Sequence, residues 1–171
     1  MSTALERLEV QLQAGCIQRY HLLPIIGEQN VAAHTYGVCQ ILRFISGDEL
    51  TPRMLMAALD HDVAEYEIGD IPFNVKRAYP HVKEALVAAE QDFEQKFGLN
   101  HPLGEREKQL VKQADVLEMG FFGKRQYQLG NEGGLTIMYN VLEALHKMNV
   151  GGKALILFDQ LARYYEDVNG K

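Results

Sequence analysis

Apolar residues recur at helical spacing along most of this chain, and this periodicity limits its fold more than any other feature. One helical face of the segment 31–45 carries, in order, Val31, His34, Val38, Ile41, Leu42 and Ile45. Asn30 is a suitable N-cap for this helix, and Gly47 is a suitable end. No segment sustains the alternation of apolar and polar residues that is typical of a strand. The sequence therefore predicts an all-α fold, a single-domain bundle of six or seven helices that occupies residues 1–171.

Capping residues and glycines predict where several of the other helices begin and end. Ser2 is the expected cap of a first helix, and Thr51 is followed by Pro52 at the first position of another. Residues 15–29 contain two glycines and a proline, and we expect them to form an irregular approach segment. The remaining predicted helices cover approximately residues 80–98, 105–120, 134–150 and a final stretch that ends at residue 165.

Two histidines and two aspartates stand where a helical fold can gather them: His34, His61, Asp62 and Asp115. His34 lies on the apolar face of its helix, a costly place for an imidazole unless the ring is hydrogen-bonded or bound to a metal. Taken singly, His34 could be a satisfied core histidine and Asp115 an exposed helix acid. Together they form the mixed nitrogen and oxygen set that a borderline divalent ion accepts. We therefore predict that these four residues bind one metal ion, which can make a bound water nucleophilic near neutral pH.

Two further carboxylates follow the His61–Asp62 pair. Glu65 lies four residues after His61 and three after Asp62, which would place it on the same face of a continuous helix. Asp70 follows Gly69, where we expect that helix to end. Both are candidates for an acid/base or water-positioning role. The alternatives are a solvated acid for Glu65 and a turn-capping carboxylate for Asp70. Three other histidines are expected at the surface or at helix ends: His81, His101 and His146.

Composition argues against several other classes of protein. Apolar residues make up 47% and charged residues 23% of the 171 residues, which is typical of a globular domain. The net charge of −6 argues against a broad surface for nucleic acid polymers. Cys16 and Cys39 lack the spacing of a zinc finger, and no apolar run approaches the roughly 20 residues of a membrane span. We expect a cytoplasmic protein without a membrane partner.

These residues occur in an order that resembles the HD-domain phosphohydrolases. The resemblance rests on residues 28–35, 61–65, 69–72, 76 and 114–115, and it runs over nearly the whole chain. The most similar subgroup is that of the bacterial 5'-deoxynucleotidases. Within it, the compact length and the segment Arg19-Tyr20-His21-Leu22 resemble the phage dATP triphosphohydrolases (DatZ) most. The resemblance implies a helical bundle of the HD-domain type.

The resemblance also implies how a deoxynucleotide is bound. It places Arg19 and Lys76 near the substrate phosphates. Lys112 is a third candidate cation, because it lies one helical turn before Asp115 on the same side. The residues expected to form an apolar slot for the base are Tyr20, Leu22, Tyr79 and Pro80.

Tyr20 marks a difference from the bacterial deoxynucleotidases. They usually carry Trp at this position, where the ring is thought to press against the sugar and reject a 2'-hydroxyl. This chain has no Trp at all. Tyr can act in the same way with a smaller ring, and ordinary packing of the approach segment is the alternative for both Tyr20 and Leu22.

Taken together, these features predict a metal-dependent phosphohydrolase of deoxynucleotides that uses Zn, Co, Mn or Mg. In its most specific form, implied by the resemblance, the enzyme cleaves dATP to deoxyadenosine and triphosphate. It would thereby deplete dATP in the host cytoplasm for a phage that uses 2-aminoadenine. The alternatives are a 5'-deoxynucleotidase acting on monophosphates and a nucleotide-binding regulator. Because relatives assemble into dimers or hexamers, we also expect a homo-oligomer.

Overall fold

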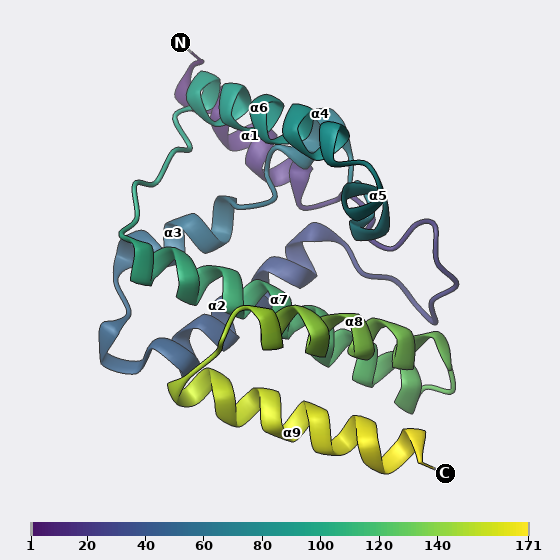
Figure 1. Cartoon of the computed structure of the whole chain (residues 1–171). Coiled ribbons are helices and arrows are strands. Elements are labelled where there is room, and N and C mark those ends of the chain that lie inside the picture. Colours follow the sequence, from purple (N-terminus) through teal and green to yellow (C-terminus); the bar gives the residue numbers. More distant parts are fainter. Residues whose placement is uncertain (1, 171) are drawn as a thin grey trace.

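The computed structural model describes residues 2–170, without the side chains of Phe73, Asn74 and Arg77. Helix follows helix along the chain (Figure 1). The helices are α1 (Ala4–Ala14), α2 (Val31–Ser46), α3 (Pro52–Asp60), α4 (Glu65–Ile68), α5 (Phe73–Ala78), α6 (Pro80–Phe97), α7 (Glu105–Gln128), α8 (Gly133–Lys147) and α9 (Gly152–Asn169), with a 3₁₀ turn, η1 (Gly47–Glu49), after α2. Residues 2–170 contain no strand, only an isolated bridge between Gln18 and Asn30. Seven of these helices have nine residues or more, so the all-α prediction is confirmed.

Side-chain caps begin the first three of these helices. Asn30 caps α2 and Thr51 caps α3, as predicted. The prediction of Ser2 as the first cap is wrong, because Thr3 caps α1. Glu6 explains the difference: its carboxylate accepts a hydrogen bond from the N–H of Thr3 at 2.6 Å, while the N–H of Glu6 donates to the Thr3 hydroxyl at 3.2 Å.

The helices enclose two separate hydrophobic cores. The large core lies between α2, α3, α7, α8 and α9, and its fully buried members include Val38, Leu42, Met54, Ala58, Ala114, Leu117 and Leu145. The small core joins α1 to α6 and to the segment after α3, and its buried members are Val10, Ala14, Val63, Ala64, Phe93, Phe97 and Leu99. Figure 1 shows α1 and α6 together at one end of the molecule, with α7, α8 and α9 at the other.

Helix α7 is the longest helix, and it is longer than the sequence predicts. The expected end near Gly120 is wrong, because α7 continues to Gln128. A Cβ atom on Gly120 would lie 2.9 Å from Cγ1 of Val141, and one on Gly123 would lie 2.9 Å from Cγ2 of Ile137. These glycines therefore allow α8 to pack closely against α7 and do not end the helix. The close packing fixes the helix that carries Asp115.

The approach segment is fastened to the far end of α7. The N–H of Ile26 donates to Oε1 of Gln126 at 2.8 Å, and Nε2 of Gln126 donates to the carbonyl of Ile26 at 3.0 Å. Nδ2 of Asn131 donates to the carbonyl of Pro24 at 2.7 Å. These bonds hold the segment that carries Arg19. In the part of the chain that the structure describes, no helix combines the length and the apolar character needed to cross a membrane.

Candidate metal centre and adjoining cavity

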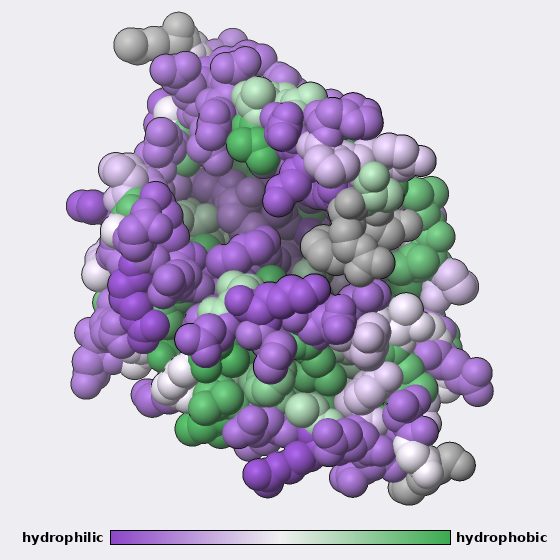
Figure 2. Space-filling model, viewed as in Figure 1, coloured by the Kyte–Doolittle hydropathy of each residue, from purple (hydrophilic) through white to green (hydrophobic). Residues whose placement is uncertain are grey.

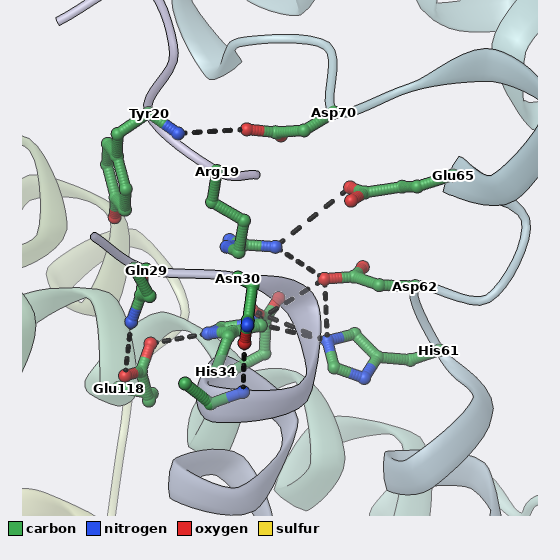
Figure 3. A network of polar contacts seen from close by, with 12 residues as sticks. Arg19, Tyr20, Gln29, Asn30, His34, His61, Asp62, Glu65, Asp70 and Glu118 are labelled. Carbon is green, nitrogen blue, oxygen red and sulfur yellow. Dashed lines mark hydrogen bonds and ion pairs between the residues drawn. The ribbon is translucent and has the colours of Figure 1, made fainter. Parts of the chain in front are cut away.

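Four side chains from three parts of the fold converge at one place. Figure 3 labels three of them, His34, His61 and Asp62. His34 comes from α2 and Asp115 from α7, while His61 and Asp62 lie in a turn directly after α3. The structure thus brings together the four residues that the sequence proposes as metal ligands.

The inner atoms of these residues are spaced as ligands of one ion. Nε2 of His34 lies 3.3 Å from Nε2 of His61, 3.6 Å from Oδ2 of Asp62 and 3.2 Å from Oδ1 of Asp115. Nε2 of His61 lies 3.3 Å from the same Asp62 oxygen and 3.9 Å from the same Asp115 oxygen. Ligands about 2.0–2.2 Å from a tetrahedral zinc ion are separated by about 3.3–3.6 Å. His34, His61 and Asp115 therefore fit a divalent ion, since one ligand atom of each lies within 4.8 Å of the others, and Asp62 places an oxygen beside both histidines.

The local backbone differs from the predicted one. A continuous helix through His61 and Glu65 was expected, but α3 ends at Asp60, residues 61–64 form a turn, and Glu65 begins α4. The turn is held in place because Val63 and Ala64 are buried in the small core. The break lets His61 and Asp62 face the same point, which neighbouring residues on a regular helix do not do.

Hydrogen bonds on the outer nitrogens orient both imidazole rings. Nδ1 of His61 lies 2.8 Å from the carbonyl of Ala58, to which it can only donate. Nδ1 of His34 makes a hydrogen bond to Oε2 of Glu118, and Oε1 of Glu118 accepts from Nε2 of Gln29 at 2.9 Å. In both rings Nε2 is left for the ion. The sequence pattern did not single out Glu118, although it lies one helical turn after Asp115 on the same face.

Charge is concentrated around the candidate ligands. Burial lowers the pKa of His34, but hydrogen bonds to Asp115 and Glu118 raise it to about 9 overall. Burial raises the pKa of Asp115, but Lys112 and His34 bring it well below its ordinary value. For Asp62, burial is outweighed in the same way by His61 and Arg19, so its pKa is also lowered. Both aspartates are therefore ionised at neutral pH and able to bind a cation.

Two cations contact the aspartates directly. Nη1 of Arg19 lies 2.5 Å from Oδ2 of Asp62 and 3.9 Å from Oε1 of Glu65, and the Arg19 side chain is buried. Nζ of Lys112 lies 2.6 Å from Oδ2 of Asp115, the oxygen that does not face His34. Nε of Arg19 is buried and has no hydrogen-bond partner among the described residues. Arg19 therefore combines an ion pair to Asp62 with one buried donor that no described residue satisfies.

Glu65 and Asp70 lie beside this centre but have different partners. Glu65 is buried, and its Oε2 has no hydrogen-bond partner within residues 2–170. Burial, and then the charge of Asp62, raise the pKa of Glu65 to about 8. Asp70 instead accepts a hydrogen bond from the N–H of Tyr20 at 3.2 Å (Figure 3). Glu65 is thus the carboxylate with an uncommitted oxygen, and Asp70 fixes the backbone of the approach segment.

A cavity of about 380 Å³ adjoins the centre between α3, α6 and α7. His61, Asp62 and Asp115 line it, together with three ammonium groups, those of Lys76, Lys108 and Lys112. Figure 2 shows a hollow bordered by hydrophilic residues between the two ends of the molecule. The cavity therefore connects the candidate ligands with side chains that can bind anions.

His101 and Asp60 also line this cavity, although neither was expected there. His101 was expected at the surface or at a helix end; it lies in the connection between α6 and α7, with 13% of its side chain exposed and Nε2 2.7 Å from Oδ2 of Asp60. The other oxygen of Asp60 accepts from Gln11 at 2.9 Å. These bonds join α1, α3 and the connection to α7 beside His61.

The four residues expected to form the base slot are not brought together. The ring of Tyr20 stacks on Phe122 with centroids 4.5 Å apart, and its backbone has a left-handed φ of 57°. Leu22 and Tyr79 are 65% and 54% exposed, and Pro80 is exposed at the start of α6. None of these four lines the cavity described above. The structure places only Tyr20 next to residues of the candidate centre.

Comparisons with known proteins identify a family and a fold. A family model described as 5'-deoxynucleotidase YfbR-like matches residues 10–160. The 5'-deoxynucleotidase VP0926 of Vibrio parahaemolyticus is 30% identical over 124 residues, a match that covers 59% of this chain and 64% of the relative. The chain therefore matches slightly less than two thirds of that relative's length.

Two solved structures share the fold. DatZ, the HD phosphohydrolase of cyanophage S-2L, bound to dA and one catalytic Zn²⁺ ion, has a TM-score of 0.70 at 22% identity, and the match covers 98% of each chain. An HD-domain phosphohydrolase from Listeria innocua has a TM-score of 0.76 at 19% identity, covering 95% of this chain and 89% of that one. The helical bundle is thus that of the HD-domain phosphohydrolases, as expected. Because the family model matches nearly all of the sequence, the chain belongs to the 5'-deoxynucleotidase YfbR-like family.

Proposed function

We propose that this protein is a metal-dependent phosphohydrolase of deoxynucleotides. The observation that carries the proposal is the convergence of His34, His61, Asp62 and Asp115 beside the buried, unpartnered oxygen of Glu65. A regulator without catalytic activity would not need this intact set. Membership of the 5'-deoxynucleotidase YfbR-like family supports the same class of reaction.

The side chains divide the work of hydrolysis between them. A divalent ion, when bound by the four ligands, supplies a Lewis acid and lowers the pKa of a water molecule. Glu65 accepts a proton from the water molecule while the water oxygen attacks phosphorus. Glu65 must be ionised to accept this proton. Burial and Asp62 oppose that ionisation, whereas Arg19 and Lys76 favour it. Asp70 supports the reaction indirectly by holding the backbone of Tyr20.

The phosphate chain of the substrate is bound by cations on both sides of the candidate ligands. Arg19 contacts Asp62 from the approach segment, and Lys112 contacts Asp115 from α7. Lys76 and Lys108 lie farther along the same cavity. Glu90 and Glu94 line the cavity as well, and Lys108 and Lys112 pair with Glu105 and Asp115. Three ammonium groups in one cavity still support a triphosphate over a monophosphate, if the phosphates replace these carboxylate partners.

Within this class we infer that dATP is the substrate. Water adds to the α-phosphorus, the bond from this phosphorus to the 5'-oxygen breaks, and deoxyadenosine and triphosphate leave. The similar structure of DatZ contains dA and a catalytic Zn²⁺ ion, which supports an adenine deoxynucleoside and zinc. Tyr20 then faces the sugar, while Leu22, Tyr79 and Pro80 belong to the base slot only if substrate binding draws them inward. For a phage that uses 2-aminoadenine, this activity would remove the competing dATP.

The second candidate is a 5'-deoxynucleotidase acting on monophosphates. The family description and the similar Vibrio parahaemolyticus protein favour it. In that case Lys108 and Lys112 have no distal phosphate to bind. The two candidates therefore differ in which lysines matter.

A competition assay distinguishes them. Equimolar dATP, dGTP, the 2-aminoadenine deoxynucleoside triphosphate, dAMP and ATP are incubated with the protein and Zn²⁺, Co²⁺, Mn²⁺ or Mg²⁺. We expect dATP to disappear first, with deoxyadenosine and triphosphate as products. Preferential loss of dAMP would establish the monophosphatase, and equal loss of all triphosphates would remove base selection from the proposal.

A further inference from the structure

Glu118 lies behind His34, on the side away from the cavity. It follows Asp115 by one turn of α7, and both side chains point toward α2. One carboxylate oxygen bonds to Nδ1 of His34, and the other accepts from Nε2 of Gln29 at 2.9 Å. His34 is 0% exposed, Gln29 6% and Glu118 9%. His34 itself is closed to water, whereas Gln29 and Glu118 also line a second cavity of about 380 Å³ beside α7.

The bond from His34 to Glu118 determines which ring nitrogen faces the other candidate ligands. An ionised carboxylate only accepts hydrogen bonds, so the hydrogen must reside on Nδ1 of His34. Nε2 is then the nitrogen that faces His61, Asp62 and Asp115, where an ion would bind in place of a proton. A carboxylate in this position also makes the ligating nitrogen more basic.

Gly37 is an independent sign that α2 and α7 leave room for Glu118. Gly37 lies one helical turn after His34 on α2. A Cβ atom at this position would lie 2.7 Å from Cγ of Glu118 and 3.2 Å from its Oε1. Any larger residue would displace the carboxylate from His34. The glycine at position 37 thus leaves the space that the side chain of Glu118 occupies.

Gln29 connects this arrangement to the substrate side. Its side chain bonds to Glu118, and its backbone carbonyl accepts from the N–H of Arg19 at 2.8 Å. Arg19 in turn contacts Asp62. One residue therefore holds both the carboxylate behind His34 and the backbone of the cation proposed to bind phosphate.

We propose that Glu118 and Gln29 are positioning residues that couple the metal site to Arg19. Glu118 fixes the tautomer and orientation of His34 for the ion. Gln29 links the position of Glu118 to that of Arg19 through its two hydrogen bonds. The metal part of this inference requires only the four candidate ligands, whereas the coupling to Arg19 rests on the proposed function.

The metal part is tested by Zn²⁺ affinity, measured by competition with a chelating dye and without any substrate. Glu118→Gln preserves shape and should keep the fold, yet it should weaken Zn²⁺ binding by about 10–100-fold. Gly37→Ala should weaken it in the same direction. Gln113→Met is the matched control, because Gln113 is buried on the same helix and has no hydrogen bond to His34. Wild-type affinity in a folded Glu118→Gln variant would overturn the role of Glu118.

The coupling is tested by a double-mutant cycle at saturating Zn²⁺. Gln29→Met and Glu118→Gln are each expected to lower kcat/KM for dATP. If the two residues are coupled, kcat/KM of the double variant should be only slightly lower than that of the less active single variant. Losses that simply multiply would overturn the coupling. If the wild-type protein binds Zn²⁺ tightly but hydrolyses no nucleotide, the proposed function fails, while the affinity test still decides the role of Glu118.

Discussion

The large and small hydrophobic cores contribute different parts of the candidate site. His34 and Asp115 project from α2 and α7, whose inner faces form the large core. His61 and Asp62 directly precede residues 63–64 of the small core. The side chains on the large core are also less exposed, at 0% and 12%, against 17% and 18% for those of His61 and Asp62.

This difference in exposure shows that one core encloses its candidate ligands, whereas the other places its candidate ligands beside the cavity. The large core holds two candidate ligands and the carboxylate of Glu118, with at most 12% of each side chain exposed. The turn beside the small core brings the other two candidate ligands to the edge of the cavity, and the buried Glu65 follows directly after this turn. An ion bound by all four residues would join the two cores, and its binding would stabilise the folded chain in proportion to RT ln(1 + [L]/Kd).

Removing a ligand beside the small core should break this connection and have the largest effect. Asp62→Ala is expected to lose bound metal and turnover together, because three remaining ligands hold an ion poorly and Arg19 loses its partner. Added Zn²⁺ should also no longer raise the melting temperature. Elemental analysis and melting curves measure both effects, with the exposed Asp48→Ala as the control. Full metal occupancy in Asp62→Ala would exclude this residue as a ligand.

Glu65→Ala should separate catalysis from metal binding. The variant is expected to retain the ion, since Glu65 acts on water, and to lose about 10²–10⁴-fold in kcat. Steady-state kinetics and elemental analysis on the same sample provide the measurement. Glu67→Ala is the matched control, because Glu67 lies on the same short helix α4 but is exposed. Its carboxylate pairs with Lys96 of α6 at 2.7 Å and not with the candidate centre. A rate near that of the wild type would leave Asp70 as the better candidate.

Lys112→Met should have a smaller effect that depends on the length of the phosphate chain. We expect kcat/KM for dATP to fall about tenfold, because a hydrogen bond to a charged group contributes roughly 1.5–3 kcal/mol and solvent screens a side chain that is 65% exposed. Turnover of dAMP should change less. Lys147→Met removes an exposed cation on α8 as the control. Equal losses of kcat/KM for both nucleotides would mean that Lys112 acts only by pairing with Asp115 and does not bind a distal phosphate.

The smallest effect concerns the stability of the protein without metal. Because the pKa of Glu65 is raised to about 8 in the fold, the folded chain holds this proton more tightly than the unfolded chain does. The resulting stability is fully present below the ordinary pKa of Glu and is lost as pH rises toward 8. Glu65→Gln removes that loss, so its melting temperature should exceed the wild type's by a few degrees at pH 8.5 and match it near pH 4. Glu67→Gln should show no such pH dependence.

Local signals in the sequence were enough for most of the long helices and for the choice of candidate ligand residues. The apolar spacing of 31–45 predicted α2, with Asn30 as its cap, and the order of His34, His61, Asp62 and Asp115 indicated one site. Local signals failed where two elements compete. Gly120 was predicted as a helix end but lies inside α7. Side chains of α8 and α9 occupy the space that a side chain at position 120 would need.

The sequence by itself determined which residues are available for metal chemistry and that His34 lies on the inner face of its helix. Only the tertiary structure decided that the chain turns after Asp60, that Glu118 rather than another acid supports His34, and that His101 lies in the cavity. The physical reason is range. Helical periodicity and capping depend on neighbours within about one turn, whereas the partner of a buried carboxylate depends on how distant helices pack.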